Sequence, residues 1–450
     1  MRDAGRKSYE DRRADGRSRR KEVPRSAHAR WEPDPGRPDP VVRLGVSDAG
    51  RLADLVPVRY GRMMASPFAF LRGAAQLMSD DLASTPVTGY RVQACGDAHL
   101  ANFGVFATPE RNLVFDVNDF DETLPAPWEW DVKRLAASVA VAAGNLNLEA
   151  RERTAAVEGT VRAYRERMGE LGPMSPLDVW YDRVDVQRVL AIAREEQAKD
   201  LEEALCVPKV RHRTSLGALP KFTTVVGERR RIVDKPPLIA HDEIEDRDAT
   251  QMLERYVESL PADRRPLLER WTIVDAARKV VGIGSVGTRC YLVLLMDHDG
   301  RTPLFLQLKE ANDAVIAPYA GPSEFEHQGQ RVVVGQRLMQ AASDIFLGWT
   351  TDGDRHYYVR QFRDMKGSVN LDVMTASGFA TYARLCGRVL ARAHARSGDA
   401  AAIAGYLGRR RTFDEAVAEF ADAYAQQTER DHSALVGAVR AGRVRASVPS

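Results

Sequence analysis

Cysteine and histidine are scarce in this chain of 450 residues. The four cysteines, Cys95, Cys206, Cys290 and Cys386, lie far apart and have neither the spacing of a zinc site nor that of a disulfide framework. The nine histidines include no His-x-His pair and no Gly-Asn-His run. These absences argue against a metal centre built from Cys and His side chains, and they predict reduced, mostly buried thiols.

Long apolar runs and a large net charge are also missing. No stretch approaches the roughly 20 apolar residues of a membrane-spanning helix, and the first residues lack the apolar core of a secretion signal. The 65 Lys and Arg residues nearly balance 63 Asp and Glu residues, so the formal net charge is +2. This balance does not favour nucleic acid as a partner. We therefore expect a cytoplasmic protein with no membrane partner.

The charge is unevenly distributed at the N-terminus. Residues 1–31 contain eleven Lys and Arg, five Asp and Glu, and almost no large apolar side chains. Because such a segment supplies little material for a core, we expect residues 1–40 to be a disordered basic tail. Weak contacts of this tail with phosphate groups are the only nucleic-acid binding that the sequence suggests.

The most informative feature is the segment 96–104, which reads Gly-Asp-Ala-His-Leu-Ala-Asn-Phe-Gly. It places an acid (Asp97), an imidazole (His99) and an amide (Asn102) close together, and a second acidic run follows at 115–122. Phosphoryl transfer requires such groups, since one carboxylate orients the attacking hydroxyl while an amide and a further carboxylate hold Mg²⁺.

A glycine motif lies much later in the chain. Residues 282–287 read Gly-Ile-Gly-Ser-Val-Gly, and the apolar segment 290–296 that follows is strand-like. A dinucleotide-binding fold would need a helix there instead. Strand, glycine loop, strand and a further strand that ends in Lys309 predict the phosphate-covering part of a protein kinase. The residues expected to contact ATP are Gly282, Gly284, Ser285, Gly287 and Lys309.

Protein kinases also carry a glutamate that pairs with this lysine, on a helix after the lysine strand. The helical pattern at 323–340 offers Glu324 and Glu326. We prefer Glu326 as the partner of Lys309.

Residues 96–102 resemble the catalytic loop of aminoglycoside phosphotransferase-like kinases, which commonly reads His-Gly-Asp-x-His-x-x-Asn. The chain departs from this pattern at the leading histidine, which is Cys95. The resemblance implies that Asp97 is the catalytic base and that Asn102 binds Mg²⁺, while His99 is expected to orient the loop by hydrogen bonding.

The resemblance also implies a metal-binding aspartate after the loop, and two residues compete for this role. Asp116 has the usual spacing from Asn102, whereas Asp119 begins an Asp-Phe-Asp sequence that is similar to the Asp-Phe-Gly of kinases. We carry both residues and rank Asp119 higher.

From about residue 50 the chain also resembles an uncharacterised bacterial family, the domain-of-unknown-function family twenty-two fifty-two. The residues that carry this second resemblance are Arg62-Met63, Ser66-Pro67-Phe68, Arg72-Gly73, the segment 96–104, the segment 118–122, Lys309-Glu310-Ala311 and Gly335-Gln336-Arg337. This resemblance implies no substrate.

The order of the two motifs is unusual, because an ordinary kinase places its glycine loop before its catalytic loop. We therefore expect a two-lobed α+β fold that is protein-kinase-like and circularly permuted, which a domain with neighbouring termini tolerates. The helical catalytic lobe comes first and the β-rich nucleotide lobe later. The expected boundaries are 41–265 for the catalytic lobe with a helical insert, 266–368 for the nucleotide lobe, and 369–450 for helices that pack on the catalytic lobe.

The expected activity is transfer of phosphate from Mg-ATP to an acceptor hydroxyl on a small molecule or a protein. A nucleotide-binding pseudokinase and an AMP-transferase remain alternatives, because they would use the same groups. A metal-dependent phosphoesterase is a further alternative, since Asp97-Ala98-His99 is also an Asp-x-His pair. That alternative leaves the glycine loop and Lys309 unexplained.

Overall fold

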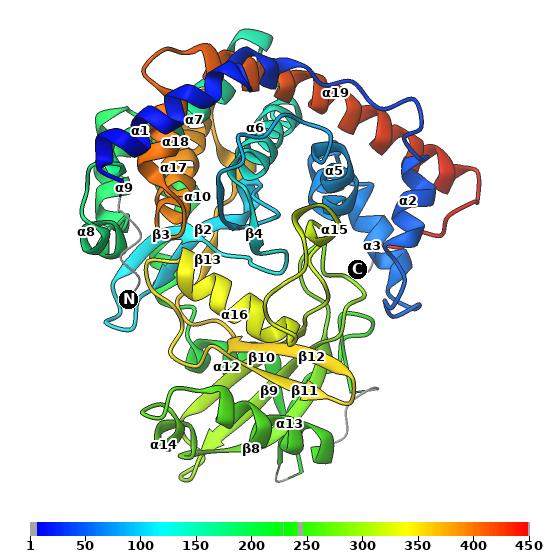
Figure 1. The fold of residues 1–450 in the computed structure, drawn as a ribbon. Helices are drawn as coiled ribbons and strands as arrows, with labels where there is room; N and C mark the ends of the chain where they lie inside the picture. The colour runs from blue at the N-terminus through cyan, green and yellow to red at the C-terminus, as the bar shows by residue number, and fades with distance from the viewer. Residues whose placement is uncertain (1–6, 228, 242–245, 449–450) are drawn as a thin grey trace.

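The computed structural model describes residues 7–227, 229–241 and 246–448, which form a mixed α+β fold in two main layers. Figure 1 shows a group of long helices at the top and a large sheet at the bottom, with α16 and short sheets between them. The expected α+β class is confirmed. Among the described residues, none of the helices combines the length and the hydropathy that crossing a membrane requires.

The upper layer is built around a buried helix. Its long helices are α6 (Trp128–Asn145), α7 (Ala150–Leu171), α17 (Ala376–Ala395), α18 (Ala400–Leu407) and α19 (Thr412–Arg440). In α6 every residue from Trp128 to Ala143 is buried, including the charged side chains of Glu129, Asp131, Lys133 and Arg134. α17 and α19 pack against α7 and α6. The helices after residue 369 thus cover the segment that follows residues 96–104, which we call the catalytic motif after the role predicted for it.

The N-terminal segment is folded from residue 7 onward, so the prediction of a disordered tail is wrong for 7–40. Residues 1–6, which the same prediction covers, lie outside the described residues. α1 (Tyr9–Ser18) packs against α18. Arg20 and Arg25 donate hydrogen bonds to carbonyl oxygens at the end of α18, including Leu407 O at 2.7 Å from Arg25. Composition misled the prediction because these arginines satisfy the free carbonyls of a helix end instead of remaining solvated.

The lower layer is a six-stranded sheet with the order β11-β12-β10-β9-β8-β7. All of its neighbouring strands are antiparallel. The strands are β7 (Ile239–Ala240), β8 (Trp271–Lys279), β9 (Cys290–Asp297), β10 (Pro303–Glu310), β11 (Gly348–Asp352) and β12 (Arg355–Gln361). The strands predicted before and after the glycine loop are confirmed as β8 and β9, and the predicted lysine strand is β10. Leu292, Leu294 and Leu306 are fully buried within this sheet.

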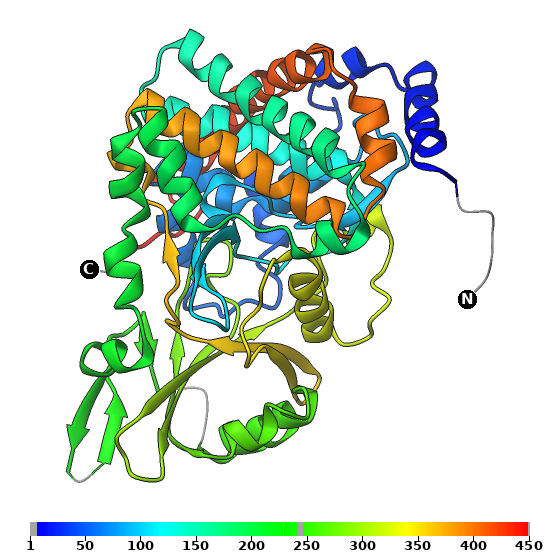
Figure 2. The ribbon, with the colours of Figure 1, turned by 90° about the vertical axis from the view of Figure 1, so that its left-hand side faces the viewer.

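Helices cover both faces of this sheet. α16 (Gln328–Met339) lies on the face toward the helical layer, and α13 (Asp246–Ser259) lies on the opposite face (Figure 2). α13 contacts β11 and β8. Because β7 and α13 precede residue 266, the sheet layer begins earlier in the chain than the expected boundary.

Two smaller sheets join the layers. One pairs β1 (Arg91–Ala94) with β4 (Leu124–Pro127), and the other has the order β13-β2-β3. Its strands are β2 (Phe103–Ala107), β3 (Leu113–Val117) and β13 (Gly367–Ser368). Since β13 follows the six-stranded sheet and pairs with β2, it ties the sheet layer to the strand that follows the catalytic motif.

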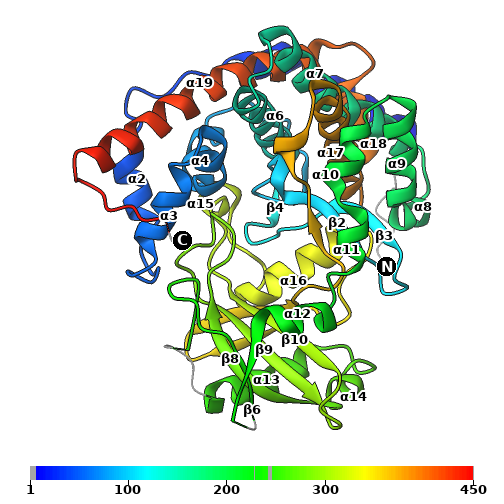
Figure 3. The same ribbon diagram turned by 180° about the vertical axis from the view of Figure 1, so that it is seen from behind.

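Four short helices, α2 (Pro40–Val46), α3 (Val56–Met63), α4 (Pro67–Gly73) and α5 (Ala75–Leu82), lie above one end of the large sheet (Figure 3). Ser66 caps α4 by accepting a hydrogen bond from Ala69 N at 3.1 Å, and Pro67 takes its first position. The backbone bends at Ala74, which separates α4 from α5.

The remaining elements are η1 (Arg19–Lys21), η2 (Arg25–Ala29), η3 (Leu100–Asn102), α8 (Pro176–Tyr181), α9 (Val186–Glu195), α10 (Lys199–Leu205), α11 (Val207–Arg211), α12 (Ser215–Phe222), β5 (Thr223–Val226), β6 (Arg229–Ile232), α14 (Arg265–Leu268), α15 (Ala317–Ala320) and η4 (Leu371–Val373).

Candidate functional site

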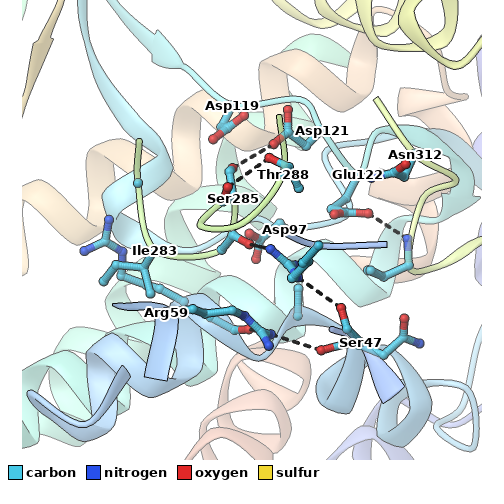
Figure 4. A pocket seen from close by; sticks show the side chains of 18 of the residues that line it. Ser47, Arg59, Asp97, Asp119, Asp121, Glu122, Ile283, Ser285, Thr288 and Asn312 are labelled. Carbon is cyan, nitrogen blue, oxygen red and sulfur yellow. Dashed lines mark hydrogen bonds between the residues drawn. The ribbon is translucent and has the colours of Figure 1, made fainter. Parts of the chain in front are cut away.

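A cavity of about 270 Å³ lies where the helical layer, the glycine loop and the end of β10 meet (Figure 4). Three sequence segments that are far apart in the chain line it. These are the catalytic motif with Asp97, His99 and Asn102, the acidic loop with Asp119, Asp121 and Glu122, and the glycine loop with Gly282, Gly284 and Ser285. The two predicted motifs therefore face one space.

The catalytic motif is held in place by a buried carboxylate in the first turn of α6. Asp131 accepts hydrogen bonds from Cys95 N at 2.6 Å and from Gly96 N at 3.0 Å. His394 Nε2 lies 3.1 Å from the same carboxylate. The side chain of Cys95, the residue that departs from the kinase pattern, is fully buried, so its backbone supports the loop while its thiol stays outside the cavity.

Asp97, the predicted catalytic base, lies at the cavity wall beside an arginine and a histidine. Arg134 Nε donates to its Oδ1 at 2.6 Å, and His99 Nε2 lies 3.7 Å from its Oδ2. Burial raises the pKa of Asp97 to about 6, although the positive charge of Arg134 opposes this shift. A carboxylate with a pKa close to neutral pH suits general base catalysis.

His99 and Asn102 complete this wall of the cavity. His99 is buried, and burial lowers its pKa well below the usual range, so its ring is neutral. Asn102 Nδ2 donates to Asp97 O at 2.7 Å. This bond fixes the amide so that its side-chain oxygen is left for a ligand.

The structure separates the two candidate metal aspartates. Asp116 is buried, and Arg392 Nη2 donates to its two oxygens at 2.6 and 2.7 Å. Ala341 N also donates to Asp116 at 2.9 Å. With its oxygens engaged away from the cavity, Asp116 is a structural residue, and its predicted role as a metal ligand is wrong.

Asp119, in contrast, lines the cavity. Its Oδ1 is buried without a hydrogen-bond partner among the described residues, and it lies 3.7 Å from Lys309 Nζ. Burial alone would raise the pKa of Asp119, but the charges of Lys309 and Arg360 outweigh burial and hold the pKa at about 2. Asp119 is therefore a permanently charged carboxylate at the cavity wall.

Asp121 connects the acidic loop to the sheet, and it was missed at the sequence level. Lys309, at the end of β10, forms an ion pair with it. Tyr358 OH donates to Asp121 Oδ1 at 2.8 Å, and Ser285 Oγ donates to Asp121 Oδ2 at 3.1 Å. One carboxylate thus joins the lysine strand, the neighbouring strand β12 and the glycine loop. Its position within the run Asn-Asp-Phe-Asp-Glu is the only sequence signal that it gives.

Glu326 is not the partner of Lys309. It is exposed, precedes the first turn of α16 and borders a second cavity beside α15. α16 instead directs Arg331 at the acidic loop, where its Nη atoms donate to Thr123 O at 2.7 Å and Asp121 O at 2.8 Å. The prediction of Glu326 as the partner is wrong because α16 begins two residues after Glu326. The side chain that α16 directs at the acidic loop is an arginine and not a glutamate.

Two arginines, one in the loop between α2 and α3 and one on α3, hold the glycine loop. Arg51 Nη1 donates to Gly284 O at 2.9 Å and to Val286 O at 2.6 Å, and Arg62 Nη1 donates to Gly282 O at 2.5 Å. The backbone N–H groups of Gly284 and Ser285 have no hydrogen-bond partner among the described residues. Free N–H groups in a glycine-rich turn are suited to binding phosphate oxygens.

Two oxygen donors in the cavity fit a magnesium ion. They are the side-chain oxygen of Asn102 and the Oδ1 of Asp119, which accepts no hydrogen bond from the described residues. Their loops are adjacent, since Asn118 N donates to Asn102 O at 2.8 Å. No group of three or more His, Cys, Asp or Glu side chains in the described part of the chain is arranged to hold a metal by itself. Mg²⁺ commonly uses one or two protein ligands together with substrate phosphates, so this pair suits it.

The class of protein that these observations define is an α+β protein with one polar cavity between an acidic loop and a glycine loop. Residues 51–438 match the model of a family described as an uncharacterized protein conserved in bacteria, DUF2252. The chain belongs to this family, so the resemblance to the uncharacterised bacterial family that the sequence indicated is confirmed. No curated protein and no solved structure matches the chain.

Proposed function

We propose that this protein is a cytoplasmic phosphotransferase that binds Mg-ATP and transfers phosphate to an acceptor hydroxyl. The observation that carries the proposal is the cavity itself, in which Asp97 and the glycine loop face one another. Lys309 reaches this site through its ion pair of 3.7 Å with Asp119. A base, a phosphate-binding loop, a lysine and two metal-binding oxygens are the parts that phosphoryl transfer requires.

The arrangement of the sheet supports a kinase-like fold in permuted order. The glycine loop connects β8 to β9, and Lys309 lies on the third strand of this series, β10. α16 and the strand pair β11–β12 then follow, and β12 returns beside β10. These are the relative positions of the glycine loop, lysine strand and following helix in a protein kinase. The catalytic motif precedes all of them in this chain.

The residues of the cavity have distinct tasks in the proposed reaction. Asp97 takes the proton of the acceptor hydroxyl, whose oxygen forms a bond to the γ-phosphorus of ATP. The bond between the γ-phosphorus and the β–γ bridging oxygen breaks, and ADP leaves with that electron pair. Arg134 keeps Asp97 oriented by its hydrogen bond of 2.6 Å. The N–H groups of the glycine loop and Lys309 hold the phosphates.

Asn102 and Asp119 would hold Mg²⁺, which supplies positive charge to the phosphate oxygens when it is bound. A phosphoesterase with two metals would need more ligands than this pair, and the described residues offer no such cluster. The proposal of phosphate transfer therefore accounts for more of the cavity than that alternative does.

An assay of ATP turnover tests this function. Radiolabelled ATP with Mg²⁺ is incubated with the protein and with bacterial metabolite or protein extracts, and ADP and labelled products are separated. We expect ADP and a labelled acceptor with the wild type and with Glu326→Ala, and at least a hundredfold less with Asp97→Ala, on the scale of a lost general base. Equal ADP production by wild type and Asp97→Ala would contradict the proposal, and release of pyrophosphate would replace it with AMP transfer.

A further inference from the structure

One arginine at the cavity, Arg72, has no ion-pair partner among the described residues. Arg72, near the end of α4, lines the cavity together with Arg51 and Arg59. Arg59 donates to Asp48 Oδ1 at 2.5 Å and to Gly73 O at 2.9 Å, and Arg51 holds the glycine loop. Arg72 makes no side-chain hydrogen bond and no ion pair with any described residue, and its Nε is buried without a partner. A buried donor without a partner is costly unless a ligand satisfies it.

Neighbouring groups position this guanidinium. Its Cζ lies 6.0 Å from the ring centroid of Phe68, and that ring packs edge-on against His99 at 6.4 Å. The backbone of the same residue lies close to the glycine loop, since a Cβ added to Gly284 would lie 3.2 Å from Arg72 O. Arg72 therefore lies between the catalytic motif and the glycine loop.

The electrostatics agree with this position. Burial lowers the pKa of Arg72, while the negative charges of Asp97 and Asp119 act in the opposite direction. The guanidinium thus interacts electrostatically with both the proposed base and the proposed metal ligand, without forming an ion pair with either. In an in-line transfer the phosphoryl group passes between the base and the metal ligand.

We propose that Arg72 is a catalytic residue that donates hydrogen bonds to the phosphoryl group while it passes from ATP to the acceptor. This inference rests on the proposed function. During transfer the negative charge spreads over the equatorial oxygens of the phosphoryl group, and a planar guanidinium can bind two of them at once. An arginine supplied within the chain would do for this protein what an arginine finger does for a nucleotide hydrolase. It comes from α4, which precedes the catalytic motif.

Steady-state kinetics and ATP binding of Arg72→Ala and Arg72→Lys test this role. We expect kcat of Arg72→Ala to fall about 10²- to 10³-fold, as for other lost transition-state donors, while the Kd of Mg-ATP changes less than about threefold. Arg72→Lys keeps the positive charge but loses the planar guanidinium, so its kcat should lie between those of the wild type and Arg72→Ala. Added guanidine hydrochloride at millimolar concentration should partly restore kcat of Arg72→Ala. Arg43→Ala is the matched control, since Arg43 is ion-paired with Asp80 on the same group of helices, and it should keep wild-type kcat.

The outcomes separate this inference from the function on which it rests. Wild-type kcat in Arg72→Ala would overturn the inference and leave the phosphotransferase standing. A loss of kcat that guanidine does not restore and that accompanies a lower Tm would also overturn it, because the role would then be structural. Absence of turnover in the wild type with every acceptor extract would instead refute the proposed function.

Discussion

At the scale of single residues, burial and charge give each acid of the cavity a different character. Burial raises the pKa of Asp97 to about 6. The neighbouring cations hold the pKa of Asp119 at about 2 despite its burial. Two carboxylates whose pKa values are driven apart in one site suit different tasks, one as a proton acceptor and one as a permanent anion.

The first prediction concerns pH. Because the raised pKa leaves Asp97 protonated below about pH 6, the base is lost as the pH falls through that value. The kcat/KM of ATP turnover should then decrease about tenfold per pH unit on the acid side. Arg134→Gln removes the charge that opposes burial, so the acid limb should move to higher pH. A flat profile between pH 5 and 7 would contradict the assignment of the base.

A second prediction separates the two aspartates that the sequence left open. Asp116→Asn removes the carboxylate that pairs with buried Arg392, and an uncompensated buried charge costs about 3 to 5 kcal/mol. Asp119→Asn leaves Lys309 its ion pair with Asp121, so the free energy of unfolding should change by less than about 1 kcal/mol. Urea denaturation measures both values, and the reverse ranking would show that the roles are exchanged.

At the scale of elements, the sequence predicted local structure well where the pattern was local. The strand-like segment at 290–296 is confirmed as β9, and the helical pattern at 323–340 is confirmed from Gln328 to Met339 as α16. The glycine loop and Asp97, His99, Asn102 and Asp119 do line one cavity. Asp121 and Arg331 were missed because their roles depend on contacts between segments about two hundred residues apart, which no local pattern reports.

A third prediction concerns the turn that starts the catalytic motif. Gly96 has φ +77°, and a Cβ there would lie 2.2 Å from Glu122 O. Gly96→Ala should therefore lower the free energy of unfolding by about 1 to 3 kcal/mol or more, because backbone strain and a clash act together. Gly169→Ala is the control, since Gly169 lies exposed within α7 with nothing within 4 Å of its added Cβ, and it should raise stability by about 0.5 to 1 kcal/mol. Denaturant titration that finds equal effects would contradict this account of the turn.

At the scale of the whole molecule, the first and the last helices of the described chain both belong to the helical layer that supports the cavity. Trp31 is 9% exposed and packs on Tyr424 of α19, with ring centroids 4.8 Å apart. Arg37 forms ion pairs with Asp81 and with Asp431. The basic composition of the first residues thus serves packing and ion pairing within the fold.

The fourth prediction follows from this packing. Trp31→Ala should lower the free energy of unfolding by about 3 to 5 kcal/mol, since it removes a large buried aromatic side chain. Arg30→Ala changes the exposed neighbour and should stay within about 0.5 kcal/mol of wild type. Equal Tm values for both variants and the wild type would mean that the N-terminal segment is not part of the fold.

The central claim is that Mg-ATP binds between the glycine loop and the acidic loop. Isothermal titration calorimetry with Mg-ATP tests it most directly, on the wild type and on Lys309→Ala, Asp119→Ala and Lys209→Ala. Lys209 is an exposed lysine on α11 and serves as the matched control. The account predicts one site in the wild type and in Lys209→Ala, affinity at least about tenfold weaker in the other two variants, on the scale of a lost charge-assisted contact, and no binding without Mg²⁺. Equal affinity in all four proteins, or no binding by the wild type, would contradict it.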